Sequence, residues 1–304
     1  MNYKILTASN DAYILTLCDF VNCYINEGFS IKNLIIYDIG ISNENIKRLY
    51  KINNYLNIQK FNFSKYPEHV SFNKYNGLNM SYAFKPIIIY NEIHNIENIG
   101  TDIFIWMDSA NRFTKKNITD IYQIVSSKGI YTPTGPGKKT IESIELNHPK
   151  TCKLLGITKE EHHNELTSIC ANLIACNFKS DIAKDIISDW YKYSLQKDVI
   201  VPEGSSRNNH RQDQSVLSIL LFKASKKYNV SLVNEENVGV HFWVKKDKIV
   251  NNSNLLPFKL LNKSDNTQLA IIYSDNLNEA TDIYINRKEI SREDFNKDFI
   301  VAVL

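Results

Sequence analysis

Glycine and proline are scarce in this sequence of 304 residues, which contains 10 and 7 of them respectively. The segment LTASND at residues 6–11, which ends the first apolar run, has no glycine at all. Glycine-rich phosphate loops need glycine there because the backbone must approach the phosphate closely. The sequence therefore argues against a sugar nucleotidyltransferase, which would carry such a loop after its first strand.

Paired cysteines and long apolar runs are also missing. The five cysteines are odd in number and show no C-x-x-C spacing, so neither a disulfide framework nor a zinc knuckle is indicated. The opening MNYKILTASND meets polar residues too early for a signal peptide, and no run approaches the roughly 20 apolar residues of a membrane helix. We expect a cytoplasmic protein, with the inner face of the membrane as a further location.

Charge of one sign is not in excess either. Lys and Arg number 36 against 33 Asp and Glu, a net charge of +3. That value is too small to indicate a nucleic acid partner, although a local basic patch would suffice for a small anionic substrate. With 43% hydrophobic and 23% charged residues, the composition is ordinary for a folded globular protein.

Patterns typical of strands and helices alternate over most of the chain. Helix patterns follow or separate the strand patterns, as at residues 14–25, 42–52, 80–93 and 117–127. The alternation predicts an α/β fold with a mostly parallel twisted sheet and helices on both faces, over residues 1–249. The expected strands are residues 3–7, 33–38, 58–63, 102–108 and 167–177, with two short strands within 230–244.

The pattern changes after Lys245. Three strand-like pieces, LAIIYSD at 269–275, DIYINRKEI at 282–290 and DFIVAVL at 298–304, are separated by polar turns. We therefore predict a small β-rich C-terminal appendage at residues 250–304.

Polar residues stand at the ends of three predicted strands. Thr7, Asp38 and Asp108 each lie at a carboxyl end, and in parallel α/β sheets ligands bind beyond these ends. Asp108 follows an apolar run abruptly and is itself followed by Ser109 and Ala110. We expect these strand ends to form one ligand-binding crevice; the alternative for Asp38 and Asp108 is that they only cap turns.

The order of several motifs carries a resemblance. Along the chain stand LTASN, LIIYDIG, YAFKPIII, IFIWMDSANRF, HRQDQSVLSILL and VGVHFW. This order resembles the GT-A class of nucleotide-sugar glycosyltransferases, in particular poorly characterised families with YDLG, KP and WMDSS-like motifs. It is similar, more distantly, to the glycogenin and lipopolysaccharide galactosyltransferase family. The likeness covers about residues 1–245.

The resemblance implies a divalent metal, Mn²⁺ or Mg²⁺, that neutralises the diphosphate leaving group from a D-x-D motif at a strand end. Asp108 takes the first acid position, and His241 takes the position of a late histidine ligand. Thr7, Ala8 and Asp38 would contact the base or ribose. Core packing is the alternative for His241.

Ala110 departs from the pattern because it replaces the second acid. Three explanations are open. Ser109 or water fills the remaining place in the metal coordination shell, the metal is weakly held, or basic side chains replace the metal in a metal-independent mechanism. Arg suits the last role because it pairs bidentately with phosphate oxygens. The candidate cations are Lys85, placed by the resemblance near the phosphates, with Arg112, Lys138, Lys139 and Arg211.

Asp213 and Gln214 stand at the start of a strongly apolar helix pattern. The resemblance implies that both lie beside the donor sugar and the acceptor. Asp213 would be the catalytic base if configuration inverts, or Asp213 or a neighbouring amide would stabilise the transition state if it is retained. The alternative is that Asp213 only complements the helix dipole.

These patterns favour a glycosyltransferase that moves a sugar from a nucleotide-sugar, UDP-linked in our hypothesis, to a hydroxyl group. The expected acceptor is a bacterial surface polysaccharide, such as capsule or lipopolysaccharide, or a lipid-linked glycan. The alternative hypothesis is a non-catalytic nucleotide-sugar or glycan-binding protein on the same scaffold, which the missing second acid at Ala110 would fit.

Overall fold

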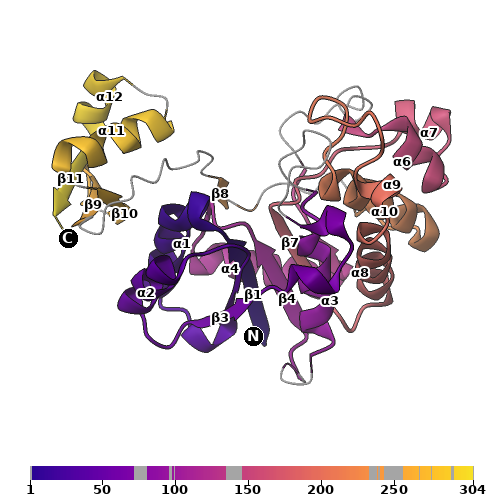
Figure 1. Ribbon diagram of the computed structural model, residues 1–304, viewed down its shortest axis with the longest axis horizontal. Coiled ribbons are helices and arrows are strands. Elements are labelled where there is room, and N and C mark those ends of the chain that lie inside the picture. The colour runs from indigo at the N-terminus through magenta and orange to yellow at the C-terminus, as the bar shows by residue number, and fades with distance from the viewer. Residues whose placement is uncertain are drawn as a thin grey trace. The chain divides into compact units, whose positions relative to one another are not determined.

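A six-stranded sheet organises most of the chain (Figure 1). The computed structural model describes residues 2–71, 81–95, 98, 100–134, 146–232, 238, 240–242, 256–266, 268–274, 276–288 and 291–303. The strand order is β3-β2-β1-β4-β7-β6. Its members are β1 (Tyr3–Ser9), β2 (Leu34–Asp38), β3 (Asn57–Lys60), β4 (Ile103–Met107), β6 (Ile130–Tyr131) and β7 (Leu173–Asn177).

The sheet is mostly parallel. Strand β1 pairs with β4, and β2 with β3, in parallel register, whereas β7 runs antiparallel to both β4 and β6. Every residue of β4 is buried, which fits its unbroken run of Ile, Phe, Trp and Met because a central strand is covered on both faces.

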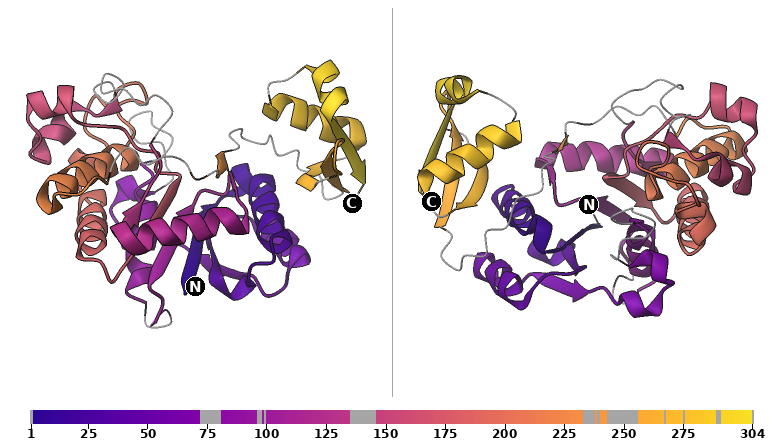
Figure 2. Two further views of the ribbon diagram at one scale, coloured as in Figure 1. Left: turned by 180° about the vertical axis from the view of Figure 1, so that it is seen from behind. Right: turned by 45° about the horizontal axis from the view of Figure 1, so that its top comes forward.

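Helices lie on both faces of the sheet at β4. Helix α3 is in front of β4 in Figure 1, and α4 crosses in front of the sheet when the molecule is seen from behind (Figure 2). The predicted α/β class with a mostly parallel sheet is confirmed. The helices before residue 230 are α1 (Ile14–Asn26), α2 (Asn43–Ile52), α3 (Phe84–Ile93), α4 (Lys115–Lys128), α6 (Pro149–Leu154), α7 (Lys159–Asn164), α8 (Asp181–Ser194), α9 (Lys197–Ile200) and α10 (Asp213–Tyr228).

The chain divides into two compact units. The first unit comprises residues 1–6, 61–107 and 116–239, and the second comprises 7–60, 108–115 and 240–304. The carboxyl-end residues Thr7, Asp38 and Asp108 all belong to the second unit, whereas Lys85 and Asp213 belong to the first.

Local signals in the sequence set several element ends. The Ser42 hydroxyl accepts a hydrogen bond from the Asn45 N–H and caps α2. Thr158 and Glu161 form a reciprocal capping box at the start of α7, as their spacing predicts.

Several strand boundaries differ from the predictions. The third strand is Asn57–Lys60 rather than 58–63, and the long apolar stretch 167–177 is a strand only from Leu173. Within 230–244, strand β8 covers His241–Phe242, residues 230–232 at the start of the first expected strand are not a strand, and Trp243 lies outside the described residues.

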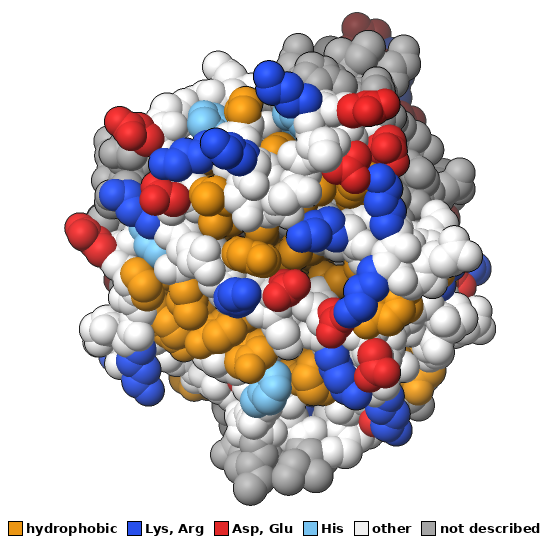
Figure 3. All heavy atoms as spheres, turned by 90° about the vertical axis from the view of Figure 1, so that its right-hand side faces the viewer, with side chains coloured by type: hydrophobic (Ala, Val, Ile, Leu, Met, Phe, Trp, Pro, Cys, Tyr) orange, Lys and Arg blue, Asp and Glu red, His pale blue; other side chains and the backbone are white. Residues whose placement is uncertain are grey.

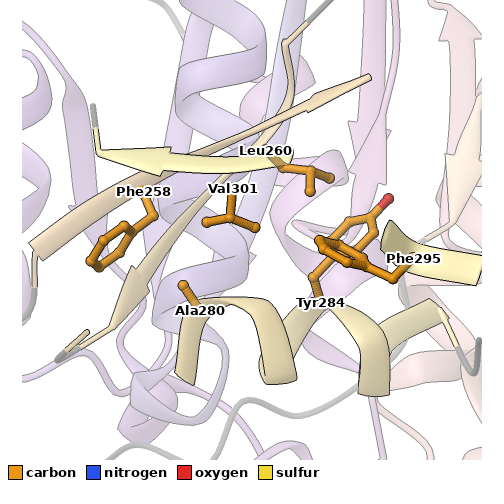
Figure 4. Close-up of a cluster of buried hydrophobic side chains, with 6 residues drawn as sticks. All are labelled: Phe258, Leu260, Ala280, Tyr284, Phe295 and Val301. Atoms are coloured by element: carbon orange, nitrogen blue, oxygen red, sulfur yellow. The ribbon is translucent and has the colours of Figure 1, made fainter. Parts of the chain in front are cut away.

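The C-terminal segment has its own sheet and core. Three antiparallel strands, in the order β10-β9-β11, comprise β9 (Leu256–Asn262), β10 (Gln268–Ser274) and β11 (Phe299–Val303), with α11 (Leu277–Lys288) and α12 (Arg292–Asp298). Figure 4 shows the buried side chains that join them. They are Phe258, Leu260, Ala280, Tyr284, Phe295 and Val301.

The strand expected at 282–290 is wrong, because residues 277–288 form helix α11. Ala280 and Tyr284 are one helical turn apart and are both buried, 0% and 1% exposed. The short apolar stretch at residues 283–285 fits either a strand or a buried helix face, and the core decides between them. The appendage therefore holds two helices as well as its β-sheet.

Candidate functional site

The carboxyl ends of the strands form the first group of candidate residues. Leu6 of β1 lies opposite Trp106 of β4, so Thr7 and Asp108 come one and two residues beyond this pair on adjacent parallel strands. Asp38 ends β2, the strand next to β1 on its other side. We call Thr7, Ala8, Asp38, Asp108 and Ser109 the strand-end group.

Asp38 is used by the turn that follows it. Its Oδ1 atom accepts hydrogen bonds from the Gly40 N–H at 2.8 Å and the Ile41 N–H at 2.6 Å. Gly40 has a φ of +128°, a conformation that side chains rarely adopt. One carboxylate oxygen of Asp38 therefore closes the turn after β2, in the manner of other turn-forming aspartates.

The loops after β1 and β2 are fastened to each other. The Ile39 N–H donates to the Ser9 carbonyl at 3.0 Å. The Asp11 Oδ1 atom accepts from the Ser42 N–H and from the Asn45 side chain, both at 2.8 Å. These bonds make this edge of the second unit a preorganised frame.

Two polar atoms in this frame stand out. The Thr7 side chain is 0% exposed, and its hydroxyl makes no hydrogen bond within the described residues; the same holds for the buried Oδ1 of Asn10. Buried polar atoms usually find partners, so a donor from a ligand is one explanation. Ala8, between them, is half-buried. Asn10 was not predicted from the sequence, because an Asn after a strand is a common turn residue.

Asp108 is half-buried, and its neighbour Ser109 is 6% exposed. The Asp108 carbonyl accepts from the Asn111 N–H at 2.9 Å, which closes a turn over Ser109 and Ala110. Strand β5 (Asn111–Arg112) follows at once and pairs antiparallel with β8, with Arg112 opposite His241. The backbone thus brings His241 to the strand that follows Asp108.

The described residues supply few ligands for a metal ion. No group of three or more His, Cys, Asp or Glu side chains within the described ranges could hold an ion. Mg²⁺ in phosphate-transferring sites is commonly held by one or two carboxylates, with substrate phosphates and water completing its shell. Asp108 supplies one such carboxylate, whereas Ala110 offers no oxygen from its side chain.

The second group of candidates lies in the first unit. Lys85 Nζ stands 3.7 Å from Asp213 Oδ2, and the two side chains are only 6% and 5% exposed. The ammonium group also donates to the Ala171 carbonyl at 3.2 Å and lies 5.3 Å from the Tyr82 ring centroid. Removing one member of such a buried pair leaves an uncompensated charge in the interior.

Unusual backbone flanks this ion pair. Gln212, directly before Asp213, has a φ of +44°, and Tyr82, three residues before Lys85, has a φ of +54°. Residues other than glycine rarely adopt this region, and such strain gathers at functional sites. The Trp190 Nε1–H donates to the Asp213 carbonyl at 3.0 Å and holds the first residue of α10 in place.

Arg211 and Gln214 are more exposed than Asp213. Both are half-buried, whereas Asp213 is 4% exposed. The Arg211 N–H donates to the Ser215 hydroxyl at 2.8 Å, and the Gln214 amide lies 3.4 Å from the Ser168 hydroxyl. Of these three neighbours, Arg211 and Gln214 are therefore open to a ligand.

A buried histidine precedes them. His210 is 0% exposed, with Nε2 at 3.1 Å from the Ile200 carbonyl and Nδ1 at 3.3 Å from the His148 N–H. Because Nδ1 accepts, the proton belongs on Nε2 of the neutral ring. Burial lowers the pKa of His210 to about 4, against a weaker upward effect of the Ile200 carbonyl. His210 is thus a buried neutral histidine that links the segment before α10 to Ile200 and His148.

Three further findings concern the predicted partners. Lys138 and Lys139 lie outside the described residues. Among the residues that are described, no helix combines the length and apolar character needed to span a membrane. On the face seen in Figure 3, basic and acidic side chains are intermingled rather than segregated.

Comparisons with known proteins give two results at the level of sequence. The model of a family described as a protein of unknown function (DUF1647) matches residues 4–90. No curated protein matches the chain.

Solved structures that are similar to this chain carry glycosyltransferase names. Galactosyltransferase LgtC, with donor and acceptor sugar analogues, is 14% identical over 71% of this chain and 70% of its own, with a TM-score of 0.43. Mouse xyloside xylosyltransferase 1 is 12% identical over 80% and 97%, with 0.46. A Pyrobaculum calidifontis mannosyltransferase with GDP-Man and Mn²⁺ is 9% identical over 78% and 55%, with 0.40. Likenesses this distant carry no statement about activity.

Proposed function

We propose that the protein is a glycosyltransferase that moves a sugar from a nucleotide-sugar, UDP-linked, to a hydroxyl of a bacterial surface polysaccharide or a lipid-linked glycan. The observation that carries the proposal is the strand-end group. A half-buried Asp108 stands on the strand next to Thr7 and Ala8, at the carboxyl end where α/β sheets bind ligands. The motif order that resembles the GT-A class supports the same activity.

The metal role belongs to Asp108 and His241, with the diphosphate as the remaining ligand. A bound Mn²⁺ or Mg²⁺ would neutralise the charge on the departing diphosphate as a Lewis acid. Asp108 carries its carboxylate on a turn that a backbone hydrogen bond closes. In this proposal the ion and the nucleotide bind together, since the protein supplies few ligands of its own.

The transfer forms one bond and breaks one. The acceptor oxygen bonds to the anomeric carbon, the bond from that carbon to the diphosphate oxygen breaks, and UDP leaves with the electron pair. The acceptor proton goes to a carboxylate base if configuration inverts, or to the leaving phosphate if it is retained. The burial of Asp213 at 4% favours a role in orienting its neighbours, among them Gln214, over direct contact with the acceptor.

Calorimetry tests the donor. UDP at concentrations on the order of 100 µM, a scale set by ordinary substrate constants, is titrated with and without Mn²⁺. We expect binding in both conditions and tighter binding with Mn²⁺, with Asp108→Asn losing only the effect of the metal. If UDP binds neither with nor without Mn²⁺, the proposal is ruled out.

The second candidate, a non-catalytic nucleotide-sugar or glycan-binding protein, is favoured by Ala110. Slow hydrolysis of a donor sugar separates the two candidates, because a transferase usually passes some sugar to water. Release of free sugar above the background of a heat-denatured sample supports the enzyme. Donor binding without any release supports the binding protein.

The remaining parts of the proposal concern place and partners. A cytoplasmic location, association with the inner face of the membrane, and a role in capsule or lipopolysaccharide synthesis follow from the proposed acceptor. Fractionation of cells that produce the protein tests the location, with release from membranes by salt as the sign of peripheral binding.

A further inference from the structure

We infer that Arg112 is a positioning residue for Asp108 and does not bind phosphate. The inference rests on the proposed function, because Asp108 matters here as the ligand of a metal. The sequence placed Arg112 among five cations that could replace the metal. Its surroundings in the second unit assign it a different role.

The Arg112 guanidinium closes the turn that carries Asp108. Its Nη1 atom donates to the Ser109 carbonyl at 2.9 Å and to the Asn111 carbonyl at 2.8 Å. Together with the bond from the Asn111 N–H to the Asp108 carbonyl, these contacts fix the path of residues 108–112. A planar guanidinium can serve two carbonyls on one side and other acceptors on its far side.

The far side of the guanidinium is attached to helix α1. Nη2 donates to the Thr16 carbonyl at 3.3 Å and lies 3.4 Å from Asp19 Oδ2. The Arg112 and Asp19 side chains are 11% and 2% exposed, so this charge pair is an interior one. Little of the Arg112 charge faces solvent, and a diphosphate would have to displace Asp19 to reach it.

The same helix holds the rest of the segment. One turn after Asp19, the Cys23 thiol donates to the Phe113 carbonyl at 3.3 Å, and one turn later a Glu27 oxygen accepts from the Lys115 N–H at 2.9 Å. The Phe113 ring packs 5.3 Å from that of Phe20. Helix α1 therefore acts as a rigid support along the whole segment from Ser109 to Lys115.

Arg112 is also part of the strand that pairs with β8. It lies opposite His241 in the β5–β8 pair, so the residue that fixes the Asp108 turn is the one against which the second proposed ligand is registered. With Ala110 in place of the second acid, the metal depends on one carboxylate and on how well that carboxylate is held. Outer groups that orient metal ligands typically contribute 10- to 100-fold in metal affinity.

Arg112→Lys tests the inference, because it keeps the charge beside Asp19 but cannot reach all the carbonyls that the guanidinium serves. UDP affinity is measured by calorimetry with and without Mn²⁺, and thermal unfolding reports the fold. We expect UDP affinity without metal to stay within about twofold, and affinity with Mn²⁺ to fall by roughly tenfold or more. Arg292→Lys, at the exposed pair with Asp282, is the matched control and should change neither.

The outcomes separate the two proposals. If the wild-type protein binds no UDP, the proposed function fails and the inference fails with it. If it binds UDP equally with and without Mn²⁺, or if Arg112→Lys leaves the Mn²⁺ effect intact, the inference alone is overturned. A fall of equal size in both conditions marks Arg112 as a general support of the fold and also overturns it. Should Arg112→Lys unfold, the charge-neutral pair Arg112→Gln with Asp19→Asn replaces it, under the same criteria.

Discussion

The carboxylates of Asp108 and Asp213 differ in what surrounds them. Asp108, in the second unit, is half-buried and follows a strand whose turn is closed by backbone bonds and by Arg112. Asp213, in the first unit, is 4% exposed and faces Lys85 inside the protein. A substitution at Asp213 therefore tests an interior ion pair, whereas one at Asp108 tests the proposed binding of metal and nucleotide. Loss of activity at both positions would have two different causes.

The largest effect is expected at Asp213. Asp213→Ala leaves Lys85 buried without its partner, and we expect the free energy of unfolding to fall by about 3–5 kcal/mol. Urea denaturation measures the change. The double variant Lys85→Met with Asp213→Leu removes both charges and should recover most of the loss. A fall below about 1 kcal/mol in the single variant would show that the pair is not an interior one.

The next effect is a pH dependence from His210, also in the first unit. Its folded pKa, about 4, lies below the ordinary value of 6.5, so the unfolded chain binds a proton more readily. Stability is complete above pH 6.5 and falls as the pH drops toward 4, by up to roughly 3 kcal/mol.

Denaturation of the wild-type protein and of His210→Asn at several pH values between 4 and 7 measures this effect. The variant should show a shallower loss on acidification. Equal slopes in the two proteins would exclude His210 as the source.

A smaller effect is expected at Asp38 in the second unit. Asp38→Ala removes the acceptor of two backbone N–H groups, and we expect a loss of about 1–2 kcal/mol. Asp38→Asn keeps an acceptor oxygen at this position and is the matched control, with a smaller loss. If Asp38→Asn and Asp38→Ala lower the thermal stability equally, the turn does not depend on the acceptor oxygen of this side chain.

The smallest change in stability is expected at Asp108. Asp108→Asn should lower the free energy of unfolding by less than about 1 kcal/mol, because Asp108 is half-buried and Asn keeps a polar side chain of the same shape. In the same samples the increase in UDP affinity with Mn²⁺ should disappear. A stability loss as large as that at Asp213 would remove the contrast between the two carboxylates.

The sequence predicted the parts of the fold that depend on local pattern. The apolar run from Ile103 to Met107 predicted a buried strand that ends before Asp108. In the structure, each residue of this strand is buried. The capping box of Thr158 and Glu161 was predicted from the spacing of the two residues, which is also a local pattern. The strand predicted at 282–290 was wrong because its short apolar stretch, residues 283–285, fits a strand or a helix, and only the packing of Tyr284 into the C-terminal core decides between them.

The surroundings of the site residues could not be predicted in the same way. Lys85 and Asp213 are far apart along the chain, and nothing local to either indicates that they form a pair. The partners of Arg112 are mostly backbone carbonyls. Every residue has a carbonyl, so the sequence does not indicate which of them Arg112 contacts. The residue types of a site were thus easier to predict than the way in which each side chain is held.

The two edges of the six-stranded sheet bear on self-association. Strand β3 is short and polar, with Asn57 and Lys60 exposed at its ends, and β6 at the other edge has only two residues, both buried. A long, flat, apolar edge strand is what recruits the strands of other chains into aggregates. Within the part of the chain that the structure describes, neither edge of this sheet provides one, and these two edges therefore offer no ready template for intermolecular β-pairing.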